Sequence, residues 1–143
     1  MPRLVVLDTN ITIALAIALP YSAGATALYD ELIRQDDLTL LAPPHWSIEV
    51  ISVIREMAFR KAISRDEAIK ALNEILSLPI TTASTEGLGR RAFEWAEMLR
   101  HAKAYDGAFL AFCELIGADF YTADERLYNA ARQNNATFIH RVK

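Results

Sequence analysis

The sequence predicts an α/β protein with a central, mostly parallel sheet of about five strands and helices on both faces. Three observations predict this fold class. Short apolar runs alternate along the chain with segments of helical spacing, as in parallel sheets whose strands are joined by helices. The 143 residues suffice for one domain with a sizeable core, and no repeat or linker divides them. The composition, 52% hydrophobic and 23% charged, is typical of a soluble globular chain, so we expect a single domain over residues 1–143.

The chain begins with a predicted strand, two helices and a second strand. Residues 3–7 are an apolar run followed by Asp-Thr-Asn, which predicts a buried strand. Residues 10–19 predict a helix that stops at Pro20. Apolar side chains at helical spacing predict another helix over residues 23–34, and the apolar run at 38–42 predicts the second strand.

The middle of the chain predicts two helices and a short strand. Ser47 can cap the first of these helices. The apolar positions of that helix form one stripe, made by Val50, Ile51, Ile54, Met57 and Ala58. Ser64 and Glu67 have the spacing of a capping box, which predicts the second helix up to about residue 77. Residues 80–83 predict the third strand.

The last third of the chain predicts three helices and two strands. Residues 86–102 predict one helix, and residues 106–116 predict another that is apolar nearly all round and therefore buried on most sides. Residues 119–122 predict the fourth strand, 125–133 the last helix and 137–140 the last strand. Right-handed crossovers between these parallel strands place helices on both faces of the sheet.

Four acidic residues are expected at the carboxyl edge of this sheet. Asp8 ends the first strand, and Asp124 follows the fourth. Glu49 lies in the first turn of the helix after the second strand, and Asp106 begins the helix that runs back toward the start of the fourth. Ligands of such sheets bind outside the carboxyl ends of the strands. Asp119 starts the fourth strand and is therefore expected at the opposite edge, roughly 16 Å from Asp124.

Each of these carboxylates also has an ordinary structural explanation. Asp106 and Asp124 can cap helices. Glu49 can complement a helix dipole, and Asp8 can form an Asx turn. Four carboxylates together, however, repel and raise one another's pKa unless a cation lies among them. Mg²⁺ or Mn²⁺ is the natural partner of such a group, and these ions can activate water for phosphodiester cleavage.

Other site chemistries find less support. Cys113 is the only cysteine, which excludes an internal disulfide and a thiolate zinc site and fits a reducing cytoplasm. His45, His101 and His140 are scattered and lack metal-ligand spacing. The net charge is −3, yet 11 of the 15 cations are arginine, so the charge balance neither favours nor excludes a nucleic-acid substrate. The longest apolar run is about half a membrane span, and no transmembrane helix is expected.

The motifs around the four carboxylates resemble those of the PIN-domain family, specifically the VapC-type ribonuclease toxins. The matching segments, in the order typical of the family, are VVLDTNI at 5–11, PPHWSIEVISVIR at 43–55, YDGAFLAFCELIGADF at 105–120 and TADERL at 122–127. The resemblance implies a PIN-like fold and a metal-dependent endoribonuclease. The residues at the matching positions that would hold Mg²⁺ or Mn²⁺ are Asp8, Glu49, Asp106 and Asp124. Asn10 and Thr122 occupy the polar positions that would support these carboxylates.

The resemblance also implies a substrate and partners. The substrate would be single-stranded or loop RNA, whose phosphates need cations beside the acidic site. The candidate cations are Lys103, Arg126 and Arg55. The partners would be a small antitoxin protein and a second copy of the chain in a homodimer, in the cytoplasm.

Two kinds of alternative remain open from the sequence. One is a phosphoryl-transfer enzyme with Asp8 as a covalent nucleophile, but the position two residues on is Asn10, which cannot act as a general acid. The other kind keeps the PIN-like fold without the toxin role. It comprises an RNA-processing nuclease without an antitoxin and a non-catalytic module that binds RNA or protein.

Overall fold

A computed structural model describes residues 2–143, which form a five-stranded sheet with the strand order β3-β2-β1-β4-β5. The strands are β1 (Arg3–Leu7), β2 (Leu38–Ala42), β3 (Ile80–Thr82), β4 (Asp119–Thr122) and β5 (Ile139–Arg141). All four strand pairs are parallel, so every carboxyl end lies at the same edge. The predicted fold class is therefore confirmed. The chain reverses its direction of strand addition beside the central β1, where β2 lies on one side and β4 on the other.

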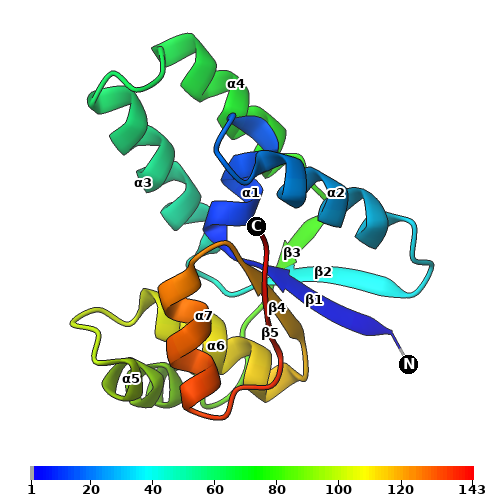
Figure 1. Ribbon diagram of the computed structural model, residues 1–143, viewed down its shortest axis with the longest axis vertical. Coiled ribbons are helices and arrows are strands. Elements are labelled where there is room, and N and C mark those ends of the chain that lie inside the picture. The colour runs from blue at the N-terminus through cyan, green and yellow to red at the C-terminus, as the bar shows by residue number, and fades with distance from the viewer. Residues whose placement is uncertain (1) are drawn as a thin grey trace.

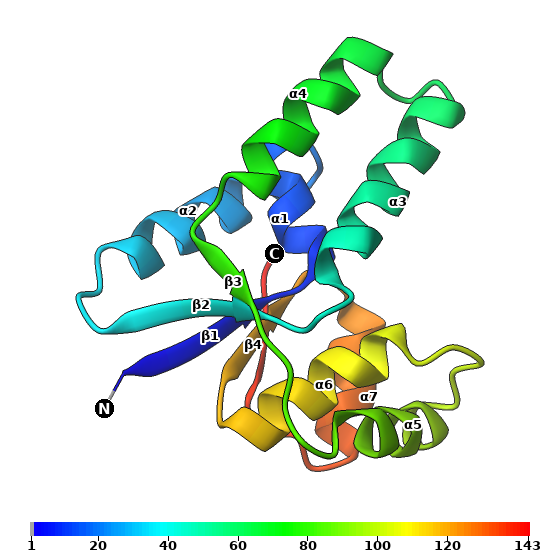
Figure 2. The same ribbon diagram turned by 180° about the vertical axis from the view of Figure 1, so that it is seen from behind.

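Helices cover both faces of this sheet, as Figures 1 and 2 show. The helices are α1 (Thr9–Ala16), α2 (Ser22–Ile33), α3 (Trp46–Phe59), α4 (Arg65–Leu76), α5 (Leu88–Leu99), α6 (Tyr105–Ile116) and α7 (Glu125–Gln133). One face carries α1 and α2, and the other carries α5, α6 and α7, while α3 and α4 form a helical hairpin that extends away from the sheet (Figure 1). Within residues 2–143, no helix combines the length and the apolar character needed to cross a membrane.

The alternation of side chains along β1 divides the core into two layers. Val5 and Leu7 pack with the α1–α2 layer, whereas Val6 between them packs with the layer that contains α6. The middle of the α6 helix is deeply buried. Its completely buried residues are Phe109, Leu110, Ala111, Phe112 and Cys113. This burial matches the prediction of a helix that is apolar nearly all round, and it fixes the position of the first turn of α6 against the sheet edge.

Two helix boundaries differ from the sequence prediction: α1 ends earlier than predicted, and α3 begins without the predicted cap. The α1 helix stops at Ala16 because the Ser22 hydroxyl donates to the carbonyl oxygens of Ala14 at 2.8 Å and Ile17 at 3.1 Å, which turns the chain into α2. The α3 helix begins at Trp46, whose N–H donates to Pro43 O at 3.1 Å, so Ser47 lies inside the helix and its predicted capping role was wrong.

The predicted capping box at the start of α4 is present. The Glu67 N–H donates to Ser64 Oγ at 3.1 Å, and the Ser64 N–H donates to Glu67 Oε1 at 3.3 Å. Each end of this box satisfies a backbone N–H that the helix cannot pair internally. The α4 helix therefore begins where the local sequence predicts it.

Candidate active site

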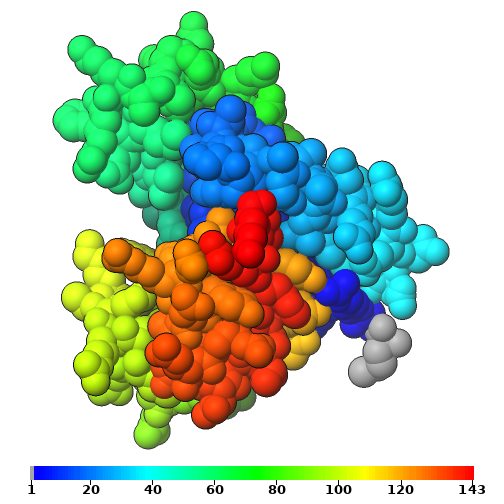
Figure 3. All heavy atoms as spheres, viewed as in Figure 1, coloured from blue at the N-terminus to red at the C-terminus, as the bar shows by residue number. Residues whose placement is uncertain are grey.

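The four acidic residues predicted to share one edge line a single cavity of about 220 Å³. They come from four places in the chain. Asp8 follows β1, Glu49 and Asp106 lie in the first turns of α3 and α6, and Asp124 follows β4. The cavity lies beside the carboxyl ends of β1 and β4, where the order of strand addition reverses. Figure 3 shows a recess on this side of the molecule, between the green spheres of α3 and α4 and the yellow and orange spheres of α5 to α7.

Asp8 is the most deeply buried of the four, with 4% of its surface exposed. Its carboxylate accepts three hydrogen bonds, from Thr9 N at 2.7 Å, Thr122 Oγ1 at 2.8 Å and Asn10 Nδ2 at 3.3 Å. The bond from Thr9 N makes Asp8 the N-cap of α1. The other two bonds hold the side chain toward the end of β4, so the carboxylate has a fixed orientation.

Asn10 and Thr122 join the end of β1 to the end of β4. The Thr122 hydroxyl donates to Asp8 and accepts from Asp124 N at 3.0 Å, and Asn10 Oδ1 accepts from Ala123 N at 3.1 Å. These bonds hold the segment that carries Asp124 against the segment that carries Asp8. Both residues thus contact the carboxylates that they were expected to support, and Asn10 also lines the cavity itself.

Asp124 combines a structural role with its position at the cavity. Its Oδ1 accepts from Leu127 N at 3.0 Å, which makes it the N-cap of α7. The capping explanation was thus right for Asp124, but it was wrong for Asp106. Ala104 is the N-cap of α6, and Asp106 is the second residue of the helix, with its side chain at the cavity.

Two histidines stand beside the carboxylates that come from helices. His45 Nε2 lies 3.8 Å from Glu49 Oε2, and His101 Nδ1 lies 3.6 Å from Asp106 Oδ2. Neither residue has metal-ligand spacing in the sequence, so no role was expected for it. The separation of four residues between His45 and Glu49 was the available signal, since such residues share a helix face. His101 lies in a loop and gave no comparable signal.

Burial and mutual repulsion disfavour charge in the cavity. Burial, followed by the charge of Asp106, raises the pKa of Asp8 to about 8, although the hydrogen bond from Thr122 acts in the opposite direction. Burial also raises the pKa of Asp106, with further contributions from Glu49 and Asp124, while His101 opposes this rise. Burial raises the pKa of Glu49 as well. The cavity therefore has an excess of negative charge that a cation would relieve.

The donor set fits a hard divalent cation. Carboxylate oxygens are the ligands that Mg²⁺ and Mn²⁺ prefer. The Thr9 hydroxyl also lines the cavity, and it is buried without a hydrogen-bond partner among residues 2–143, although it lies near enough to Glu49 to favour the charged form of that carboxyl. Among residues 2–143, no group of three or more acidic, histidine or cysteine side chains lies close enough together to hold a metal ion in the present arrangement. The four carboxylates thus surround the cavity rather than meet at one point.

The three cations predicted to bind RNA lie in different surroundings. Lys103 lines a second cavity of about 650 Å³, which also contains Glu49 and Asp106. Arg126 is exposed in the first turn of α7, two residues after Asp124. Arg55 lines the groove between α3 and α4, with its guanidinium 5.4 Å from the centre of the Phe59 ring. Of the three, only Lys103 shares a cavity with the acidic residues.

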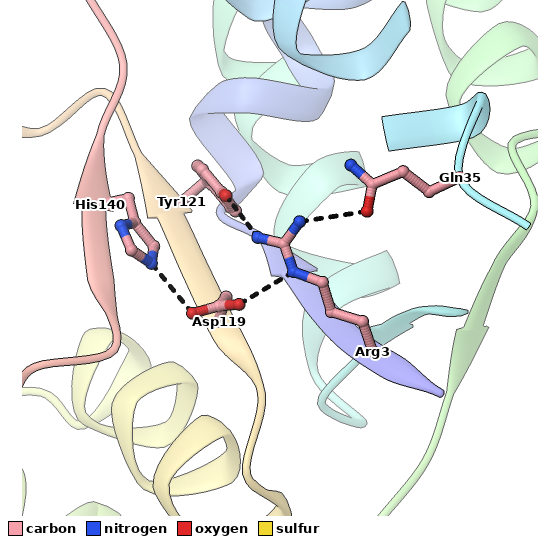
Figure 4. A network of polar contacts seen from close by, with 5 residues as sticks. All are labelled: Arg3, Gln35, Asp119, Tyr121 and His140. Carbon is pink, nitrogen blue, oxygen red and sulfur yellow. Dashed lines mark hydrogen bonds and ion pairs between the residues drawn. The ribbon is translucent and has the colours of Figure 1, made fainter. Parts of the chain in front are cut away.

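Asp119 lies at the opposite edge of the sheet, as predicted. It begins β4, and Figure 4 shows it between Arg3 at the start of β1 and His140 on β5. Arg3 Nε donates to Asp119 Oδ2 at 3.1 Å, and His140 Nε2 lies 2.9 Å from Asp119 Oδ1. Burial alone would raise the pKa of Asp119, but the hydrogen bonds with His140 and Arg3 outweigh it and hold that pKa below its ordinary value. Asp119 therefore ties three strands together away from the acidic cavity.

Comparison with known proteins decides the family. The sequence profile of the PIN domain matches residues 5–133, which include all four carboxylates. The chain belongs to the PIN domain family. It is 30% identical over 131 residues to Ribonuclease VapC12 of Mycobacterium tuberculosis (strain CDC 1551 / Oshkosh), covering 92% of this chain and 95% of that protein.

Solved structures share the PIN fold at lower sequence identity. VapBC2 from Rickettsia felis, bound to a DNA fragment from its promoter, has a TM-score of 0.71 at 12% identity and covers 98% of this chain and 99% of its own. The VapC20 toxin of Mycobacterium tuberculosis, which cleaves the sarcin–ricin loop, has a TM-score of 0.64 at 19% identity and covers 88% of this chain and 94% of its own. The resemblance found in the sequence motifs is thus confirmed at the level of family and fold.

Proposed function

We propose that this PIN domain is an endoribonuclease that depends on Mg²⁺ or Mn²⁺ and hydrolyses phosphodiester bonds in single-stranded or loop RNA. One observation carries the proposal. Four carboxylates from separate parts of the chain line one cavity at the switch point of the sheet, and burial raises the pKa of Asp8, Glu49 and Asp106. The names of Ribonuclease VapC12 and of the VapC20 toxin support RNA as the substrate class.

The residues that would hold the metal are Asp8, Glu49, Asp106 and Asp124. A bound divalent ion supplies a lowered pKa for its water and neutralises charge that develops on the phosphate. The chain itself supplies orientation. Thr122 and Asn10 fix the Asp8 carboxylate with bonds of 2.8 and 3.3 Å, and Thr122 also holds the backbone of Asp124.

The histidines beside two of these carboxylates would act on their charge. His45 lies 3.8 Å from Glu49, and His101 lies 3.6 Å from Asp106. Burial lowers the pKa of His45, which favours its neutral form, while His101 and, to a smaller extent, His45 offset the rise in the pKa of Asp106. We assign these two side chains a positioning role toward Glu49 and Asp106 rather than a place among the reacting groups.

We further propose that the protein is the toxin of a toxin–antitoxin pair and forms a homodimer in the cytoplasm. The identity to VapC12 over nearly the whole of both chains and the likeness to the VapBC2 assembly support this proposal. An apolar groove of about 470 Å³ between α3 and α4 offers a surface for a partner helix, and Ile51 and Ile69 are 39% and 41% exposed in it. Inhibition by the product of a short reading frame directly upstream would support the pairing. Without it, an RNA-processing nuclease that has no antitoxin is the better assignment.

The enzymatic proposal is tested with purified protein and end-labelled RNA. Cleavage is expected with Mg²⁺ or Mn²⁺, no cleavage is expected with EDTA, and Asp8→Asn and Asp106→Asn should both be inactive. Asp119→Asn is the matched control, since it removes the same charge at the opposite edge and should still cleave. Cleavage that survives both EDTA and the two active-site substitutions would refute the proposal. RNA binding without any cleavage would instead favour a non-catalytic module.

A further inference from the structure

The loop between α5 and α6 borders a second cavity next to the acidic one. This cavity, of about 650 Å³, shares Glu49 and Asp106 with the smaller acidic cavity. Its remaining lining includes Arg100, Lys103 and Tyr105. The two cavities therefore adjoin through Glu49 and Asp106, and the second one adds two cations and an aromatic ring.

Arg100 adopts a backbone conformation that a glycine would adopt more easily. Its φ is 59° at the C-cap of α5, whereas the equivalent position of α6 is Gly117, with φ of 73°. A non-glycine residue in this left-handed region has a cost of roughly 1 kcal/mol. Neither Arg100 nor Lys103 forms an ion pair within the described part of the chain. Intramolecular pairing therefore does not explain a cation at this strained position.

Tyr105 supplies an exposed ring that is supported from behind. It is 57% exposed and lines both the second cavity and a smaller one of about 170 Å³. The His45 ring lies behind it with 6.0 Å between ring centres, and the Phe109 ring meets His45 edge-on at 4.9 Å. Phe109 is completely buried. This series of rings connects Tyr105 to the core, so the exposed ring has a defined position next to the carboxylates.

We propose that this second cavity is a nucleotide subsite, in which Tyr105 stacks on an unpaired base next to the scissile bond and Arg100 and Lys103 bind the neighbouring phosphate. The inference rests on the proposed ribonuclease function and adds the features by which that site selects its substrate. Base stacking on an aromatic side chain requires an unstacked base, which single strands and loops provide and a duplex does not. Because every base has a flat face, the subsite selects for unpaired RNA more than for one base.

The test measures binding without cleavage, in the Asp8→Asn background and in EDTA. The probes are a short fluorescein-labelled single-stranded RNA of randomised sequence and an abasic ribose-phosphate chain of the same length, followed by fluorescence anisotropy. Tyr105→Ala should weaken binding of the RNA by at least about fivefold and leave binding of the abasic chain unchanged, while Tyr105→Phe should bind both probes like the parent. Arg100→Gly and Lys103→Ala should weaken binding of both probes, and each should lower the slope of log affinity against log salt by about 0.7.

Matched controls separate a binding role from a structural one. Arg100→Gly relieves the left-handed backbone, so its melting temperature should equal or exceed that of the parent while its RNA binding falls. Phe93→Ala and Lys70→Ala remove an exposed aromatic and an exposed cation from other surfaces and should bind like the parent.

The outcomes also separate the subsite from the proposed function. If the wild type cleaves RNA but the Tyr105 and Arg100 variants bind like the parent, the subsite is wrong and the ribonuclease stands. If the protein binds RNA without cleaving it, the proposed function fails and the variants still decide the subsite. If it neither binds nor cleaves RNA, both are overturned.

Discussion

The buried carboxyl of Asp8 should make the metal-free protein less stable as the pH rises. In the unfolded chain its pKa is about 3.8, and in the folded protein it is about 8. Between these values the folded state keeps a proton that the unfolded state has lost. The stabilisation is therefore complete below about pH 4, and it is lost as the pH rises through about 8. The difference between the two pKa values corresponds to about 6 kcal/mol for ionising this one group in the folded state.

Asp8→Asn removes that titration while nearly preserving the shape of the side chain. The asparagine oxygen can still accept from Thr9 N, whereas the new amide takes the place of Oδ2 and puts a donor beside Thr122 and Asn10, as a protonated carboxyl would also do. At about pH 4 the carboxyl is neutral in the folded protein and about half protonated in the unfolded chain, so the variant should lie within about 1 kcal/mol of the wild type. At about pH 9 the variant should be more stable by several kcal/mol, up to about 6.

The assay is urea unfolding followed by circular dichroism, in EDTA, over this range of pH. The free energy of unfolding is obtained by linear extrapolation at each pH. Parallel curves for wild type and Asp8→Asn would refute the reasoning, because they would show that Asp8 ionises in the folded state as it does in the unfolded chain. Asp119→Asn is the control of opposite sign. The pKa of the Asp119 carboxyl is lower in the folded protein than in the unfolded chain. Its ionised form therefore stabilises the fold above the unfolded pKa, and this contribution is lost on acidification. Asp119→Asn should thus lose the most stability at neutral pH.

Three further predictions concern the metal, a helix cap and a helix contact. The affinity for Mn²⁺, measured by calorimetry, should rise with pH through about 8, because the ion must displace the proton of Asp8. Asp124→Ser should keep the cap on Leu127 N and lie within about 0.5 kcal/mol of the wild type in stability, yet lose cleavage by about 100-fold or more. Gly107→Ala should lower stability by about 1–3 kcal/mol in urea unfolding, since the new Cβ would lie 2.6 Å from Ala92 O in α5.

Each of these three has a result that contradicts it. An Mn²⁺ affinity that does not change with pH would mean that Asp8 carries no proton when the metal binds. Full activity in Asp124→Ser would remove Asp124 from the metal-holding group and leave it only its capping role. An unchanged free energy of unfolding in Gly107→Ala would mean that α5 and α6 can separate without cost.

The grouping of the carboxylates was predictable because it depends on chain direction. Asp8 and Asp124 follow strands that the apolar runs identify, and Asp106 opens a helix that runs the other way. In a parallel sheet these positions must share one edge. The same rule placed Asp119 at the other edge, where it contacts Arg3 and His140. Local periodicity and strand direction were enough for both results.

Helix boundaries were less predictable because side chains from the next element set them. The helix predicted over residues 10–19 ends three residues earlier, at Ala16. There the Ser22 hydroxyl forms hydrogen bonds with the carbonyl oxygens of Ala14 and Ile17. Ser47 is not the N-cap because α3 already begins at Trp46, where a backbone turn closed by the hydrogen bond from Trp46 N to Pro43 O leads into the helix. Helix propensity alone does not contain such contacts.

By itself, the sequence determined the α/β class, the parallel sheet and the set of four carboxylates, since each of these follows from the order and direction of local elements. Only the tertiary structure decided that β1 is central, that His45 and His101 stand beside Glu49 and Asp106, and that burial raises the pKa of Asp8 to about 8. Burial and proximity through space depend on how the elements pack, because residues far apart in the chain contribute the neighbouring charges and exclude the water.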